Sequence, residues 1–195
     1  DEEEAYDAMV HAYTHARDPA YWKKALVFMQ RWARAIPGPG SGHFHNHYGY
    51  AYFEHGLYTE AEREFRAYIR VSPDEANAYD SLAELYVMTG RPEMAIEQYG
   101  EALRRNPMFG WSHFGRAYAL ASLGRYDEAF AGLTTVRNLG SRGDVPVAFV
   151  HLIDAFFNQR VGRYQDAAAA LERARRIARD FEDTRAQADT DLFEA

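Results

Sequence analysis

Apolar side chains in this chain recur at the spacing of an α-helix. Between residues 95 and 103 they fall on one helical face, because a helix completes a turn about every 3.6 residues. These positions are Ala95, Ile96, Tyr99, Ala102 and Leu103. The pattern predicts an amphipathic helix here, and related segments recur at a constant interval along the chain.

Glycine and proline residues mark the interval at which these segments recur. Gly56, Gly90 and Gly124 are 34 residues apart, and so are Pro73 and Pro107. Each glycine is followed after five residues by an alanine and after nine by a large apolar residue. The alanines are Ala61, Ala95 and Ala129, and the apolar residues are Phe65, Tyr99 and Leu133. A fixed period of this size indicates stacked structural repeats.

Each residue type in the repeat has a physical role in a pair of helices. Small residues let two antiparallel helices approach closely, and large apolar residues fill the seam between them. Glycine suits the left-handed backbone that ends the first helix, and proline stops the second helix. The repeat therefore predicts two helices on either side of each glycine.

The period and the residue types resemble the tetratricopeptide repeat, a helix–turn–helix unit of the same length. The segment 76–109 matches the family's pattern best, and the segment 42–75 departs from it by placing Tyr68 where a small residue is usual. The matching residues are Tyr79, Leu82, Ala83, Tyr86, Gly90, Ala95, Tyr99, Ala102 and Pro107. The resemblance, to a bacterial-type protein or to a segment of a larger one, implies an all-α fold, a right-handed α-solenoid of antiparallel helix pairs.

We expect one elongated domain over residues 1–195, made of consecutive segments. These are a divergent helix pair (1–41), two repeats (42–75 and 76–109), a repeat with a long loop (110–145), a divergent repeat (146–178) and a last helix (179–195). The long loop is expected from Asn138 to Pro146. Two registers are open for the first helix of 110–145: a gapless one, and one shifted by two residues. The last helix is either a cap or the start of a further, severed repeat.

The composition of the chain excludes several classes of function. The net charge of −7 argues against general nucleic-acid binding, which needs a basic face. Cysteine is absent, which excludes disulfides, a thiol catalyst and cysteine metal sites. No apolar run is long enough to cross a membrane, and no signal segment opens the chain. We expect a cytoplasmic protein, with a periplasmic location after loss of a signal segment as the alternative.

The resemblance also implies a binding groove. In tetratricopeptide arrays the first helix of each repeat lines a concave surface, mostly through positions 2, 5, 9, 12 and 13. The groove residues expected here are Asn46, Tyr50, Phe53, Glu54, Asp80, Glu84, Trp111, Phe114, Tyr118, Phe149 and Phe156. Ala121, Ser122 and Arg160 occupy such positions too. The groove would be acidic in its middle and aromatic toward its carboxyl side, which predicts a basic and apolar partner. Alternatively, some of these side chains pack between helices or lie under the last helix.

The other groups of residues that could carry chemistry are better explained by structural roles. His43 and His47, like His11 and His15, are one helical turn apart and could share a metal ion. No third ligand is apparent, and His45 occupies a packing position, so we expect no metal site. Chaperone-tail binders of the family use a clamp of Lys, Asn and Arg, which is missing here. The arginines between 173 and 179 indicate a solvated outer face, and the GPGSG segment 38–42 indicates a flexible link.

We therefore expect a non-catalytic scaffold or adaptor, without a cofactor, that binds a peptide or helix of a partner protein in its concave groove. A second hypothesis is a regulatory or sensor segment of a larger signalling protein or enzyme. A third is a self-assembling scaffold, in which one copy receives the terminal helix of another.

Overall fold

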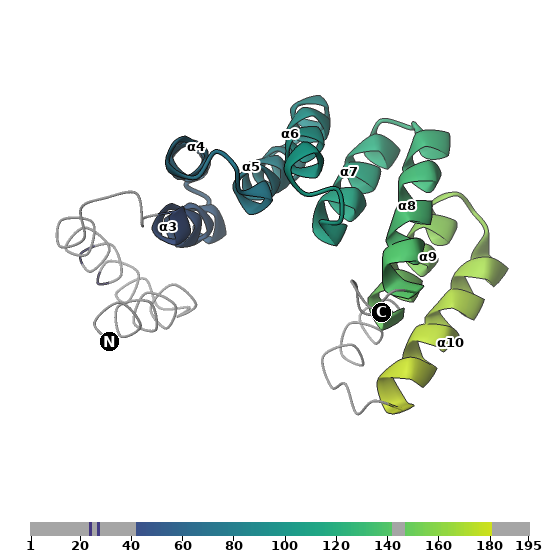
Figure 1. Cartoon of the computed structure of the whole chain (residues 1–195). Coiled ribbons are helices and arrows are strands. Elements are labelled where there is room, and N and C mark those ends of the chain that lie inside the picture. The colour runs from purple at the N-terminus through teal and green to yellow at the C-terminus, as the bar shows by residue number, and fades with distance from the viewer. Residues whose placement is uncertain (1–23, 25–26, 28–41, 142–146, 181–195) are drawn as a thin grey trace. The chain divides into compact units, whose positions relative to one another are not determined.

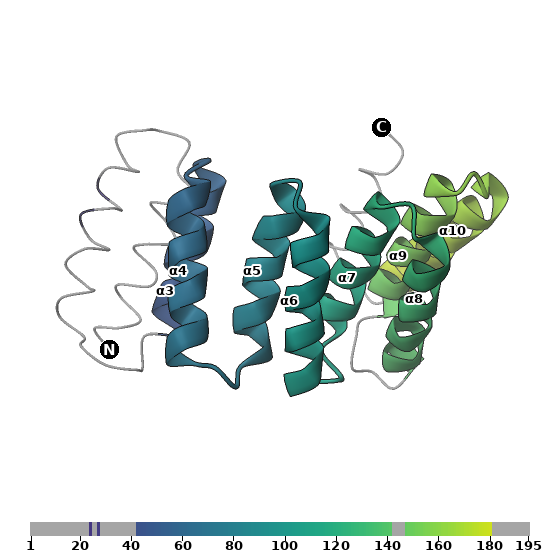
Figure 2. The same ribbon diagram turned by 90° about the horizontal axis from the view of Figure 1, so that it is seen from above.

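The computed structural model describes residues 24, 27, 42–141 and 147–180. Within these ranges the chain is all-α, with eight helices and no strand (Figures 1 and 2). The helices are α3 (Gly42–Glu54), α4 (Tyr58–Val71), α5 (Ala76–Met88), α6 (Pro92–Arg105), α7 (Gly110–Ser122), α8 (Tyr126–Ser141), α9 (Val147–Arg160) and α10 (Tyr164–Asp180). The predicted all-α solenoid of helix pairs is confirmed. Of the predicted divergent pair (1–41), the structure describes only residues 24 and 27, and of the predicted last helix (179–195) it describes only residues 179 and 180, which belong to α10.

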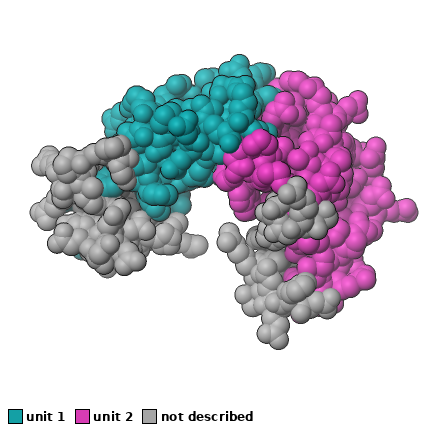
Figure 3. All heavy atoms as spheres, in the orientation of Figure 1, with its two compact units in different colours: residues 1–105 teal, residues 106–195 magenta. Residues whose placement is uncertain are grey.

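The contacts within the chain define two compact units, Asp1–Arg105 and Asn106–Ala195 (Figure 3). In unit 1, α3 pairs with α4 and α5 pairs with α6, while α5 also contacts α4 and α3. In unit 2, α7 pairs with α8 and α9 pairs with α10, and α8 joins the two pairs through α9. A single domain over 1–195 stays a prediction.

Glycine ends the first helix of each of the four described pairs. Gly56, Gly90, Gly124 and Gly162 have φ of 73°, 72°, 75° and 77°, in the left-handed region that favours a residue without Cβ. At Gly90 the backbone N–H donates to the Val87 carbonyl, and the next N–H returns to the Tyr86 carbonyl over 2.8 Å. These bonds satisfy carbonyls at the helix end, so the turn predicted from the glycine period is confirmed.

Small residues lie where the helices of a pair cross. Ala61, Ala95 and Ala129 are each 0% exposed. A Cβ added to Gly49 on α3 would lie 2.3 Å from the Phe65 ring of α4, so this crossing has no room even for a methyl group. The predicted close approach of paired helices is therefore confirmed.

The register of 110–145 follows from the same rule. Helix α7 begins at Gly110, and Ala117, the eighth residue of the repeat, is buried. The shifted register would instead place Gly115 at this position, but Gly115 is partly exposed. The structure therefore has the gapless register.

Tyr68 occupies a position that is usually small, and its neighbours make room for it. Its side chain is buried, and a Cβ on Gly42 would lie 2.9 Å from the Tyr68 ring. The hydroxyl donates to the Glu75 carboxylate over 2.5 Å. Burial, followed by this hydrogen bond, raises the pKa of Tyr68 to about 12. A glycine at the start of one helix thus compensates for a large residue on the next.

The expected loop from Asn138 to Pro146 is wrong at its start, because α8 continues to Ser141. Leu139 is buried, as are Leu133 and Val136 on the same helix. Their spacing extends the apolar face of α8 by almost one turn beyond the turn-forming residue Asn138. Burial of Leu139 therefore outweighs the local preference of Asn138 and Gly140 for a turn.

Candidate functional site

An aromatic row connects the first helices of the two pairs in unit 2. The row comprises Trp111, Phe114 and Tyr118 of α7 with Phe149 and Phe156 of α9. Residues three, four and seven apart share one helical face, so each helix contributes a stripe of rings. The sequence predicted all five as groove residues, and the structure brings all five together.

The rings touch in pairs across the two helices. The centre of the Phe149 ring lies 4.6 Å from that of Trp111 and 5.6 Å from that of Phe114. Tyr118 and Phe156 stack at 5.5 Å with an angle of 23° between their planes. These separations are typical of favourable aromatic pairs. Trp111 nevertheless remains 55% exposed, so the row presents apolar surface to solvent.

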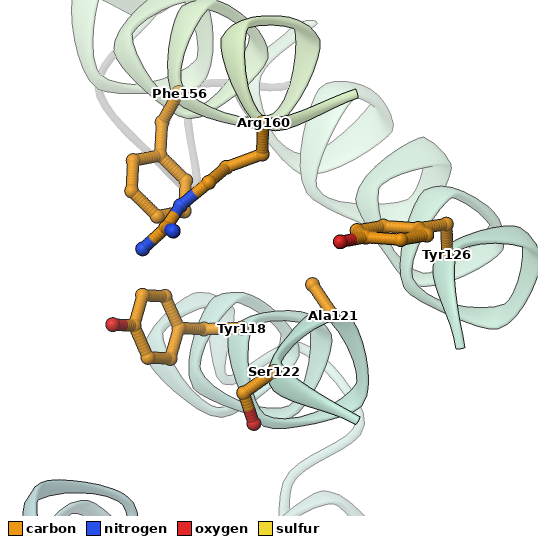
Figure 4. Close-up of a pocket in the computed structure, with 6 residues that line it drawn as sticks. All are labelled: Tyr118, Ala121, Ser122, Tyr126, Phe156 and Arg160. Atoms are coloured by element: carbon orange, nitrogen blue, oxygen red, sulfur yellow. The ribbon is translucent and has the colours of Figure 1, made fainter. Parts of the chain in front are cut away.

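A cavity of about 270 Å³ adjoins the row (Figure 4). Its lining residues are Tyr118, Ala121, Ser122, Tyr126, Phe156 and Arg160. Tyr118 and Phe156 are shared with the row. Sequence reasoning missed Tyr126, because it lies on α8, a second helix, whereas the groove pattern considers first helices. Its position two residues after the turn glycine was the available signal.

The cavity combines aromatic walls with a cation. The Arg160 guanidinium carbon lies 5.3 Å from the centre of the Phe156 ring, within range of a cation–π interaction. Figure 4 shows this guanidinium beside the ring, and Tyr126 directing its hydroxyl toward the same space. The Ser122 hydroxyl donates to the Ala119 carbonyl over 2.7 Å and is therefore engaged within its helix.

The corresponding positions of unit 1 form a polar network between α3 and α5. The Ser81 hydroxyl donates to the Asn46 side-chain oxygen over 2.8 Å, and the Tyr50 hydroxyl donates to the Glu84 carboxylate over 2.7 Å. Burial, followed by the nearby Glu84 charge, raises the pKa of Tyr50 far above its usual value. These side chains hold two neighbouring repeats together.

Two of the three acidic residues expected in the groove of unit 1, Asp80 and Glu84, are buried or half-buried. Asp80 is 9% exposed and counts among the buried polar residues. Glu84 is half-buried and accepts the hydrogen bond from Tyr50. Of the remaining predicted groove residues, Glu54 is exposed, and Phe53 is half-buried with its ring 5.8 Å from that of Tyr58.

The structure describes some of the histidines that the sequence singled out as metal-ligand candidates. His45 Nδ1 lies 2.8 Å from the Glu64 carboxylate, and His43 is exposed. Burial opposes ionisation of Glu64, but hydrogen bonds from His45 and Arg63 hold its pKa below the usual value. Within the described ranges, no three His, Cys, Asp or Glu side chains gather as metal ligands would. His11 and His15 lie outside those ranges.

Two further predictions concern the surface. Arg173, Arg176 and Arg179 of α10 are exposed to solvent as predicted, whereas Arg175 is half-buried. Among the described helices, none has the length and apolar character needed to cross a membrane.

The sequence and the fold both have known counterparts. A profile of the tetratricopeptide repeat matches residues 20–78, 48–107 and 81–133. Superkiller complex protein 3 of Mus musculus is 31% identical over 83 residues, which make up 43% of this chain and 5% of that protein. The Homo sapiens protein matches with the same identity and coverage. The chain thus spans about a twentieth of these curated relatives.

Solved structures share the fold at lower identity. The thermophilic tetratricopeptide repeat protein TTC0263 of Thermus thermophilus superposes with a TM-score of 0.73 at 20% identity, over 96% of this chain and 97% of its own. The crystal structure of MamA superposes with a TM-score of 0.63 at 15% identity, over 84% of this chain and 92% of its own.

Proposed function

Because this chain belongs to the tetratricopeptide repeat family, we propose that it is a protein-interaction scaffold whose aromatic row holds a peptide or helix of a partner protein. Proteins of this family are generally non-catalytic and stack their helix pairs into extended binding surfaces. The exposed, ring-paired surface of Trp111 and its neighbours is the observation that carries the proposal.

A row of half-buried aromatic rings with an exposed tryptophan at its end suits a binding surface energetically. Tryptophan and tyrosine dominate the binding energy of many interfaces, because each buries a large area at little cost in conformational entropy. Trp111 is held by Phe149 before any partner arrives, so little further ordering is needed when it is covered. The row therefore supplies preorganised apolar anchors.

The shape of the row favours an elongated partner. Its rings occupy two stripes, one on each helix, and an amphipathic helix offers apolar side chains at matching intervals of three, four and seven residues. The apolar half of the partner chemistry expected from the sequence is retained in this proposal. The basic half rested on Glu54, Asp80 and Glu84, of which Asp80 is buried and Glu84 accepts a hydrogen bond from Tyr50.

Peptide selection tests the proposal. A library of random peptides would be panned against the whole chain, and the affinity of the enriched peptides measured by calorimetry. We expect Trp111→Ala to weaken their binding by roughly 2 kcal/mol or more, as for an interface hot spot. The matched control is Tyr164→Ala, which removes another aromatic side chain of unit 2, 71% exposed on α10. Peptides that bind both variants as tightly as the parent would exclude the aromatic row as the binding surface.

A further inference from the structure

We propose that the cavity beside the aromatic row binds a carboxylate side chain of the partner protein, with Arg160 as its counter-ion. The inference rests on the proposed function, since the cavity continues the row through Tyr118 and Phe156. It assigns a chemical class to one residue of the partner: an Asp or Glu next to the apolar side chains that cover the rings.

Hydrogen-bond donors without a matching acid gather at this cavity. Arg160 carries five N–H donors and no acceptor, and the Tyr126 hydroxyl is directed toward the same space. Among the described residues, no Asp or Glu lines the cavity, and Arg160 has its contact with the Phe156 ring and no ion pair. A carboxylate accepts two parallel bonds from a guanidinium, which is the geometry that such a group can satisfy best.

Two other arginines of unit 2 have the carboxylate partner that Arg160 lacks. Arg137 binds Asp154 with its closest nitrogen–oxygen distance at 2.6 Å, and Arg125 binds Glu128 at 2.6 Å. Both guanidiniums already have a carboxylate from their own unit. Arg160 instead rests on the Phe156 ring, which positions the cation without neutralising it.

The charge of the cavity favours a carboxylate over a phosphate group. Arg160 is the one cationic side chain among the described lining residues, so it balances a single negative charge. A phosphate monoester carries a charge of about −1.5 to −2 at neutral pH and would remain partly uncompensated there. Apolar walls at Ala121 and Phe156 make such an excess charge unfavourable.

The overall negative charge of the protein does not oppose an acidic ligand in unit 2. Residues 1–105 contain 11 Lys and Arg against 17 Asp and Glu, a net charge of −6, whereas residues 106–195 contain 11 against 12, a net charge of −1. Most of the net charge therefore belongs to unit 1. Unit 2 is nearly neutral, and salt screens the more distant charges further.

Charge reversal provides the test. The peptide library would be panned in parallel against the parent chain and against Arg160→Glu, with helix content checked by circular dichroism. The matched control is Arg163→Glu, which makes the same charge change beside an aromatic ring, since Arg163 lies 5.4 Å from the centre of Phe130 and outside the cavity lining. Arg160 also ends α9 and complements its dipole, so a small loss of stability is expected.

We expect the parent to enrich peptides with Asp or Glu beside aromatic or aliphatic residues, and Arg160→Glu to enrich Lys or Arg at that place. The parent-selected peptides should bind Arg160→Glu roughly tenfold to a hundredfold more weakly, as for loss of a charged hydrogen bond. Arg163→Glu should change their affinity little.

Three outcomes would overturn the inference. Peptides that need Trp111 but carry no acid, and that bind both arginine variants equally, would exclude the cavity while leaving the proposed function standing. Tighter binding of a phosphoserine peptide than of its glutamate counterpart would reassign the site to phosphate. No enrichment, or enrichment insensitive to Trp111→Ala, would exclude the proposed function and the inference together.

Discussion

Side chains at the same repeat positions form hydrogen bonds with one another in unit 1 and aromatic ring pairs in unit 2. At the ninth position, Tyr50 donates to Glu84 in unit 1, whereas Tyr118 stacks on Phe156 in unit 2. At the fifth position, Asn46 accepts from Ser81 in unit 1. The helix scaffold is common to both units, so the chemistry of a few side chains decides whether the surface between repeats is internally satisfied or available to a partner.

The difference has an energetic basis. A hydrogen-bonded pair such as Tyr50 and Glu84 would lose its bond if a partner separated it, and an unpaired buried carboxylate is costly. Paired rings such as Trp111 and Phe149 lose nothing when a further apolar group covers them. Unit 1 is therefore suited to holding repeats together, whereas in our proposal unit 2 receives the ligand.

The largest expected effect on stability comes from overfilling the helix crossings, which both units share. Ala95→Leu in unit 1 and Ala129→Leu in unit 2 both overfill a helix crossing at which the alanine is 0% exposed. Overpacking of this kind typically costs about 1–3 kcal/mol of unfolding free energy. Urea denaturation followed by circular dichroism measures it. If both variants were as stable as the parent, the crossings would tolerate larger side chains. That result would contradict the close helix packing assigned to both units.

Alkaline pH should destabilise unit 1 through Tyr68. In the unfolded chain tyrosine releases its proton near pH 10.0, whereas folded Tyr68 holds it up to about 12. Between these values the unfolded state binds fewer protons, so the free energy of unfolding falls as pH rises, by up to about 2 kcal/mol. Tyr68→Phe should flatten this fall, measured as the denaturation midpoint at several pH values. An unchanged slope would show that other groups govern alkaline unfolding.

The two tyrosines at the ninth position should respond differently to loss of the hydroxyl. Tyr50→Phe leaves the half-buried Glu84 carboxylate without its donor, so we expect the free energy of unfolding to fall by about 1 kcal/mol. Tyr118→Phe keeps the ring stacked on Phe156 and should change it by less than about 0.5 kcal/mol. Thermal and urea unfolding of the pair provide the measurement. Equal effects would remove the contrast between a polar and an aromatic face.

Chelation should have the smallest effect, with the melting temperature unchanged by EDTA. In unit 1 His45 is engaged by Glu64, and His43 is exposed without gathered ligands in the described ranges. A thermal melt with and without EDTA checks this prediction. A clear fall in melting temperature that zinc restores would assign a metal to the histidine cluster and a further function to unit 1.

Much of the fold could be predicted from the sequence because its repeat is a backbone requirement. A positive φ at Gly90 and a crossing without room at Ala95 each restrict the residue type directly, so the spacing reveals them. The five aromatic residues of unit 2 were predicted as groove residues through the family resemblance, and their helical spacing places each stripe on one face. These features depend on neighbours within one repeat.

Tertiary structure decided the features that depend on more distant neighbours. Burial of Leu139 extends α8 past a turn-forming segment, and Asp80 is buried although its position suggested an open groove wall. The cavity needs Tyr126 from a second helix beside Arg160 from a later repeat. Sequence alone thus determined where the helices turn and cross, because those constraints are local. Packing decided which side chains find a hydrogen-bond or ring partner inside the protein and which remain available to a ligand. The reason is that the identity of a residue does not reveal a partner contributed by another repeat.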